Sequence, residues 1–118
     1  MSVYSGEVEI ESGDFHMEFE RFIVRDKEYS FSVKGDDDEG EFELEGVAQL
    51  SSAGEYQADT QVVYPTYMQK NKPWSGPVTI VIESAVESKG GKNCLVRGRW
   101  QQNQETWRFN GKLTPFKP

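Results

Sequence analysis

The sequence predicts an all-β fold, an antiparallel up-and-down meander of about eight strands. Three observations lead to this prediction. Apolar and polar residues alternate with a period of two along most of the chain, as in strands with one buried and one wetted face. The period of 3.6 residues that marks an amphipathic helix is nearly absent. Clusters of Gly, Asp, Asn and Ser separate the alternating segments, as turns do.

Each expected strand is an alternating segment whose apolar residues share one face. In the first, Val8 and Ile10 alternate with glutamates, and in the last, Trp107 and Phe109 alternate with Arg108. The alternating segments span residues 8–10, 15–19, 29–33, 42–50, 56–64, 78–82, 96–100 and 107–113. Turn signals fall at residues 12–14, 25–27, 35–40, 51–54, 89–92 and 102–105.

Two further segments are expected to lie outside the strands. The acidic run 36–39 predicts a solvated hairpin tip. Residues 65–77 hold three prolines and Gly76, and they predict a long irregular loop that carries Tyr67 and Trp74. A loop of this length in a compact domain is often functional, although a plain crossover is the alternative.

Glycines in the inward phase predict that the sheet closes into a small barrel. Gly46, Gly98 and Gly111 each stand where the alternation requires an inward residue. Repeated glycines let strands bend and approach each other closely, and we expect them to leave space inside. Asn110-Gly111 is also a strong hairpin signal, so the last segment could instead turn back at this point.

The distribution of charge also favours closure. Glu7, Glu9 and Glu11 point outward from the first strand, and Arg108 and Lys112 point outward from the last. If the sheet closes, these two strands become neighbours and their opposite charges face each other across the seam. The alternatives to a barrel are a β-sandwich and an open sheet that a partner covers.

The size and composition of the chain predict one domain, residues 1–118, with a single core. Hydrophobic residues are 36% of the 118, and aromatic residues are 13%, so the core is expected to use few, large side chains. The sequence shows neither a signal-peptide pattern nor an apolar stretch that could span a bilayer. A single cysteine excludes an internal disulfide. We therefore expect a cytoplasmic protein that makes no use of a membrane.

The net charge of −7 argues against a nucleic-acid partner, because binding to phosphates requires a basic surface. Residues 1–59 carry 17 acidic and 4 basic side chains, whereas residues 60–118 carry 3 acidic and 9 basic ones. Such a division predicts complementary charged faces. A protein-interaction module of the inhibitor, immunity or adaptor type, or self-association, is therefore one hypothesis for function.

Residues able to catalyse a reaction or to bind a metal or cofactor are scarce. His16, the only histidine, falls in the outward phase, and Cys94 shares the inward phase of Val96, which predicts a buried, unreactive thiol. One histidine and one cysteine cannot form a typical zinc site, and the run that begins at Asp36 departs from the calcium-loop pattern. We predict no catalytic residues, no metal and no cofactor, and an enzyme is the least favoured class.

The tripeptide Gly98-Arg99-Trp100 is similar to the Gly-x-Trp motif of lipocalins. In lipocalins the motif lies on the first strand, whereas here it lies on the next to last. At the level of architecture, the predicted barrel resembles the calycin-type barrels, which comprise lipocalins, fatty-acid-binding proteins and avidins. The resemblance implies a closed barrel that binds a small ligand, and it assigns no binding residue.

Aromatic residues are the candidates for a binding site. Ligand pockets are commonly apolar and aromatic with a few placed polar groups. The candidate ligand-binding residues are Tyr56, Tyr64, Tyr67, Trp74, Trp100 and Trp107. The leading hypothesis is a non-enzymatic domain that holds a small apolar or aromatic ligand in the barrel or at its mouth. The alternative is that these side chains simply fill the interior.

Overall fold

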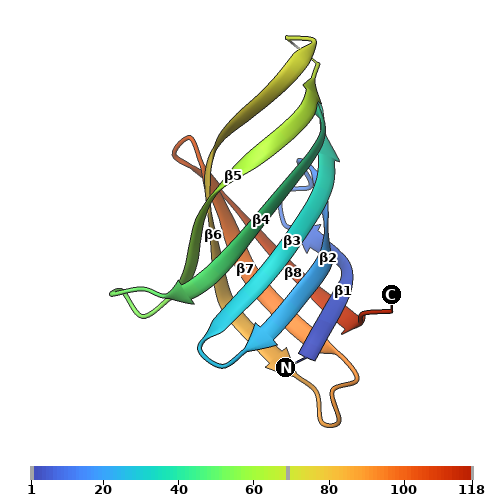
Figure 1. The fold of residues 1–118 in the computed structure, drawn as a ribbon, viewed down its shortest axis with the longest axis vertical. Coiled ribbons are helices and arrows are strands. Elements are labelled where there is room, and N and C mark those ends of the chain that lie inside the picture. The colour runs from blue at the N-terminus through green and yellow to red at the C-terminus, as the bar shows by residue number, and fades with distance from the viewer. Residues whose placement is uncertain (1, 69, 118) are drawn as a thin grey trace.

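Eight antiparallel strands close into one barrel in the computed structural model, which describes residues 2–68 and 70–117. Each strand is hydrogen-bonded to the next along the chain, and the first also pairs with the last (Figure 1). The strands are β1 (Ser2–Ile10), β2 (His16–Arg25), β3 (Glu28–Asp37), β4 (Gly40–Leu50), β5 (Tyr56–Tyr67), β6 (Lys72–Glu87), β7 (Cys94–Gln102) and β8 (Glu105–Pro115). The predicted meander and its closure are confirmed, and the β-sandwich alternative is wrong.

The alternation of apolar and charged residues directs one face of every strand into a common core. Phe19 of β2, Val33 of β3 and Val96 of β7 are fully buried, whereas Glu43 and Arg97 on the opposite face are exposed. Among the described residues, the buried set contains no charged side chain. Burial of apolar surface, which contributes roughly 25 cal/mol per Å², therefore holds every strand in the same inward-facing register.

Three inward glycines lie directly opposite a phenylalanine on the neighbouring strand. The pairs are Gly35 with Phe42, Gly46 with Phe31, and Gly98 with Phe109. In each pair the tip of the ring lies only 2.5–3.1 Å from the point at which a Cβ atom of the glycine would stand. The expectation that inward glycines leave space is therefore wrong, because aromatic rings occupy that space.

Aromatic rings fill the middle of the barrel. The ring centroid of Phe19 lies 5.2 Å from that of Phe22, 5.8 Å from that of Phe31 and 6.0 Å from that of Phe109. All three contacts are edge-to-face, which is a favourable geometry for aromatic pairs. A ligand would therefore have to bind at an end of the barrel and not at its centre.

The seam between β1 and β8 does not use the predicted charge pairs. In the part of the chain that the structure describes, Glu7 pairs with His16 at 3.2 Å and Arg108 pairs with Glu83 at 3.0 Å. These partners lie on β2 and β6, away from the seam. The constant register of the seam does place Glu7 level with Lys112 and Glu11 level with Arg108, as predicted. Because the ion pairs of Glu7 and Arg108 go to other strands, closure depends on backbone pairing and inward packing.

Gly111 lies inside β8, so the hairpin alternative at Asn110-Gly111 is also wrong. A Cβ atom at this position would stand 2.7 Å from Cγ1 of Val8 on β1. The glycine thus has the role expected of it in a closed barrel, because it lets the first and last strands approach closely.

Residues 65–77 are not a loop, which corrects the prediction made for them. β5 continues to Tyr67 and β6 begins at Lys72, and the two form a hairpin that extends beyond the rest of the barrel (Figure 1). Tyr64 lies opposite Trp74 across this hairpin. The connection between the strands is only a short turn.

Proline is tolerated in this hairpin because part of β6 has a neighbour on one side only. β6 pairs with β7 from Thr79 onward. Pro73 and Pro77 precede that point, so no strand on the open side requires the N–H group that proline lacks. Pro65 lies at the irregularity in pairing between Tyr64 and Tyr67.

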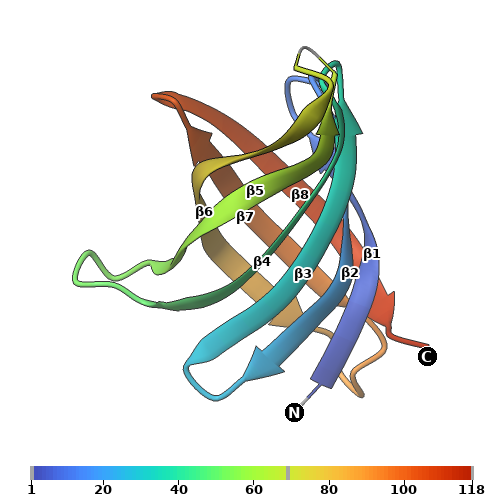
Figure 2. The same cartoon turned by 45° about the horizontal axis from the view of Figure 1, so that its top comes forward.

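The two ends of the barrel differ in what they carry. The connections that follow β1, β3, β5 and β7 lie at one end, which we call the pocket end (Figure 2). The chain termini and the connections that follow β2, β4 and β6 lie at the other, which we call the terminal end. None of the described residues belongs to a helix with the length and hydropathy that a bilayer crossing requires.

Candidate functional site

A cavity of about 550 Å³ lies at the pocket end, between the connections that follow β1, β3 and β7. Its volume falls within the range of roughly 300–1,000 Å³ that is typical of small-molecule sites. The aromatic residues that line it are Phe15, Phe42, Tyr64, Trp100 and Trp107. The polar residues that line it are Asp14, Asp37, Asp38, Glu39, Gln102 and Glu105.

Trp100 is held in place on the inner side of the cavity. It occupies an inward position of β7 and is only 3% exposed. Its ring lies 5.3 Å from that of Phe15 and 5.4 Å from that of Phe42, centroid to centroid. Its Nε1–H group donates a hydrogen bond of 2.9 Å to Oε1 of Gln102. A buried indole whose polar group has a partner provides a rigid aromatic surface.

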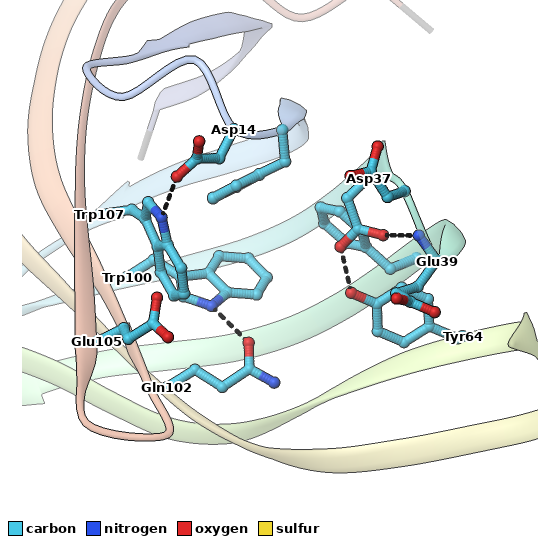
Figure 3. A pocket seen from close by; sticks show the side chains of 11 residues that line it. Asp14, Asp37, Glu39, Tyr64, Trp100, Gln102, Glu105 and Trp107 are labelled. Carbon is cyan, nitrogen blue, oxygen red and sulfur yellow. Dashed lines mark hydrogen bonds between the residues drawn. The ribbon is translucent and has the colours of Figure 1, made fainter. Parts of the chain in front are cut away.

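Trp107 forms the neighbouring wall on β8, directly opposite Trp100 in the strand register. It is half-buried, and its Nε1–H group donates a hydrogen bond of 2.8 Å to Oδ2 of Asp14 (Figure 3). Phe15 packs against its ring at 5.8 Å. The connection between β1 and β2 is thereby attached to the last strand of the barrel.

Tyr64 and Asp37 form the opposite wall (Figure 3). The Tyr64 hydroxyl donates a hydrogen bond of 2.5 Å to Oδ2 of Asp37, and the backbone N–H of Glu39 donates one of 2.8 Å to Oδ1. Burial, together with the hydrogen bond to Asp37, raises the pKa of Tyr64 well above its usual range. Tyr64 therefore stays protonated and fixes the Asp37 carboxylate in one orientation.

The cavity is acidic, because none of the described residues that line it is a Lys, Arg or His. The side chains of Asp38 and Glu105 make neither a hydrogen bond nor an ion pair with any residue that the structure describes. The acidic run 36–39, predicted as a solvated tip, spans the end of β3 and the turn that leads to β4. However, Asp37 and Glu39 are half-buried, and with Asp38 they line the cavity.

The structure brings three of the six predicted binding residues into this cavity, namely Tyr64, Trp100 and Trp107. Tyr67 and Trp74 lie behind Tyr64, with ring centroids 5.2 and 5.9 Å from it, and support it without lining the cavity. Tyr56 is at the terminal end and is remote from the site.

Tyr56 was predicted to bind ligand because it shares the inward phase, but phase does not specify the end of the barrel. Its ring packs against that of Tyr29, with centroids 4.9 Å apart. Tyr29 in turn stacks on Phe22 at 5.5 Å. These rings cover the core at the terminal end, so Tyr56 does not line this cavity.

Sequence reasoning missed the polar residues of the site and Phe15. Asp14, Gln102 and Glu105 stand at or beside turns, where polar residues are common. Their positions next to Phe15, Trp100 and Trp107 were the only available signal. That signal becomes informative only when the topology brings the three turns to one end.

The residues considered for catalysis lie elsewhere. His16 is exposed on the outer surface between Glu7 and Asp36, as its phase predicts. Cys94 is fully buried at the start of β7, and burial, with a smaller effect of Glu87, raises the pKa of its thiol to about 11. Within residues 2–68 and 70–117, no three His, Cys, Asp or Glu side chains converge as metal ligands.

Comparisons with protein-family models, with curated proteins and with solved structures find no significant match.

Proposed function

We propose that this barrel is a non-enzymatic binding domain that holds a small ligand with an aromatic or apolar body at its pocket end. The observation that carries the proposal is the cavity of about 550 Å³ whose walls include Tyr64, Trp100 and Trp107. Indole and phenol rings offer large, rigid contact area at a low cost in conformational entropy. The polar residues around them can orient a ligand.

The mouth of the barrel, and not its centre, is the proposed location. Phe19 and its aromatic neighbours pack the middle of the barrel. Trp100 and Phe42 stand between that packed region and the cavity, so a ligand would rest on them.

The positions of His16 and Cys94 support binding over catalysis. His16 is on the outer surface, and Cys94 is buried at the terminal end with a raised pKa. A nucleophile and its base need to be within hydrogen-bond reach of each other and of the substrate. The cavity presents aromatic surfaces and hydrogen-bond acceptors instead.

We also propose a relationship in binding mode to the calycin-type barrels. An up-and-down barrel of eight strands is the architecture shared with lipocalins and avidins. Trp100 of Gly98-Arg99-Trp100 lines the cavity here, on β7. The packed interior differs from a barrel that encloses its ligand, so the proposed likeness concerns the open end alone.

The alternative function, a protein-interaction module that acts through its charged faces, stays a prediction. Arg99 donates hydrogen bonds of 2.8 Å to both carboxylate oxygens of Glu55 and one of 3.0 Å to Glu83, which also pairs with Arg108. These contacts engage part of the basic strip on β7 and β8, which makes this alternative the weaker one.

Titration with phenethyl alcohol, a neutral aromatic probe, tests the proposed function. Two of the three tryptophans line the cavity, so we expect a saturable change in tryptophan fluorescence and shifts of the Trp100 and Trp107 indole N–H signals in NMR spectra. Trp107→Ala should weaken binding by about tenfold, since it removes one aromatic wall. Tyr56→Phe, at the terminal end, is the matched control and should bind as the wild type does.

The proposal would be contradicted if phenethyl alcohol and its amine and carboxylate analogues all produced no saturable change at the indole groups. Equal affinity of the wild-type protein and the Trp107→Ala variant would also contradict it, because binding would then lie elsewhere.

A further inference from the structure

We infer that the ligand of this cavity is an organic cation, an amine or quaternary ammonium group carried on an aromatic or apolar body. The inference rests on the proposed function and specifies the chemical class of its ligand. It follows from the combination of the cavity volume, the indole walls and the sign of the lining charges.

Among the described residues, all the charged side chains that line the cavity are acidic. They come from three separate connections, with Asp14 after β1, Asp37, Asp38 and Glu39 around the turn after β3, and Glu105 after β7. Charges of one sign in a concave, partly desolvated site attract the opposite charge and repel their own. A fatty acid or other anion would therefore be disfavoured, and a cation favoured.

Two of these carboxylates are fixed by aromatic residues of the cavity itself. Asp14 accepts the Trp107 indole N–H at 2.8 Å, and Asp37 accepts the Tyr64 hydroxyl at 2.5 Å. The acceptor groups thus keep their positions without a ligand, so binding requires little reorganisation. Asp38 and Glu105 make no such bond with the described residues and remain available to a ligand.

The carboxylates lie on both sides of the cavity, with the indoles among them. Asp14, Trp107 and Glu105 are on one side, and Asp37 and Glu39 are on the other (Figure 3). A metal ion needs several oxygen atoms that converge on one point. The observed arrangement suits a cation that fills the volume and also contacts aromatic faces, since organic cations are attracted to indole rings.

The test compares three probes of nearly equal size, namely phenethylamine, phenethyl alcohol and phenylacetate, by calorimetry and NMR. We expect phenethylamine to bind about tenfold more tightly than the alcohol, and phenylacetate to bind most weakly. The preference for the amine should decrease as sodium chloride is raised to ~0.5 M, because salt screens charges.

Charge-neutralising variants identify the groups responsible. Asp38→Asn combined with Glu105→Gln should reduce the amine-to-alcohol preference to about threefold or less while the affinity for the alcohol is retained. These side chains have no partner among the described residues, so the fold should be unaffected, as circular dichroism would show. Asp26→Asn, in the turn between β2 and β3 at the terminal end, is the matched control.

Each outcome distinguishes the inference from the proposed function. Equal affinity for the amine and the alcohol would overturn the inference and leave the proposed function standing. Failure of all three probes to bind would contradict the proposed function, and the inference with it. If calcium chloride displaced the amine more strongly than sodium chloride at equal ionic strength, the carboxylates would form a metal site, and the inference would again be overturned.

Discussion

At the scale of single residues, each phenylalanine that lies over a glycine occupies the volume that a second side chain would need. The Phe109 ring approaches to 2.6 Å the point at which a Cβ atom of Gly98 would stand, and the carbonyl oxygen of Val81 lies at 2.3 Å from it. Neither can move without disturbing the strands, because the interior of the barrel is closely packed.

Gly98→Ala is therefore expected to lower the free energy of unfolding by about 1–3 kcal/mol. Gly46→Ala is the comparison, because the three atoms nearest to its Cβ atom would be side-chain atoms of Phe31 and Ala58, at 3.1–3.2 Å. The decrease in the free energy of unfolding should be smaller for Gly46→Ala than for Gly98→Ala. Urea denaturation of both variants measures the difference, and equal losses would show that the backbone contact with Val81 does not matter.

The inward phase of Gly46 and Gly98 was predictable from the alternation alone. What fills the space above them was not, because it depends on which residues stand opposite each other on neighbouring strands. A shift of register by two residues would preserve the alternation and yet separate Gly98 from Phe109. The phase of a residue can be determined from the sequence of one strand, whereas the register depends on how two strands pair.

At the scale of elements, the hairpin of β5 and β6 is the segment whose structure differs most from the prediction. Proline and glycine normally interrupt a strand, so residues 65–77 were predicted as a loop. The strands continue because β6 has an open side before Thr79. The alternation predicted that Tyr64 points inward, but only the hairpin shows why Tyr67 and Trp74 lie beside it.

Trp74 holds this hairpin together, since its ring contacts those of Tyr64 and Tyr67 and covers Gly76. Trp74→Ala should lower the free energy of unfolding by about 1–3 kcal/mol. In this variant the amide hydrogens of the hairpin should exchange faster than they do in the wild type. The increase should be larger there than in β2 and β3, because the opening would be local.

Met68→Ala is the control for this variant, because Met68 is in the same hairpin but 66% exposed. It should change stability by no more than about 0.5 kcal/mol. If hydrogen exchange in the hairpin were equally slow in the Trp74→Ala variant and the wild type, the aromatic cluster would not be what holds the hairpin.

At the scale of the whole molecule, the site could be predicted only in part. Trp100 and Trp107 were identified because alternation and residue type are local properties. The acidic residues were not identified, because Asp14, Asp37 and Glu105 belong to three turns that only the closed topology brings together. The number of strands and the closure followed from patterns repeated along the entire chain, which explains why the fold was more predictable than the site.

The stability of the whole barrel is expected to fall in alkaline solution. Burial, followed by the hydrogen bond to Glu87, raises the pKa of Tyr4 from 10.0 to about 12, and burial raises that of Cys94 from 9.0 to about 11. Both groups are protonated in the folded state over a range in which the unfolded chain loses the proton. A raised pKa contributes stability that is complete below the unfolded value and is lost as pH rises through the folded value.

The free energy of unfolding should therefore decrease between about pH 9 and pH 12, by up to about 1.4 kcal/mol per pH unit for each group. Urea denaturation across this range measures the slope. Tyr4→Phe removes one of the two groups and should make the slope shallower between pH 10 and pH 12. An identical slope in that variant would mean that Tyr4 is not involved.

The pairing of Ser5 with Thr114 has a consequence for the order in which the protein can form. On a ribosome, β1 emerges first and β8 emerges last, so a nascent chain of seven strands has two unsatisfied edges. Such edges are sites of aggregation, and contacts between distant parts of a chain slow folding. A chain that stops before β8 would expose both edges at once, so arrival of the final strand is the step that commits the protein to its native state.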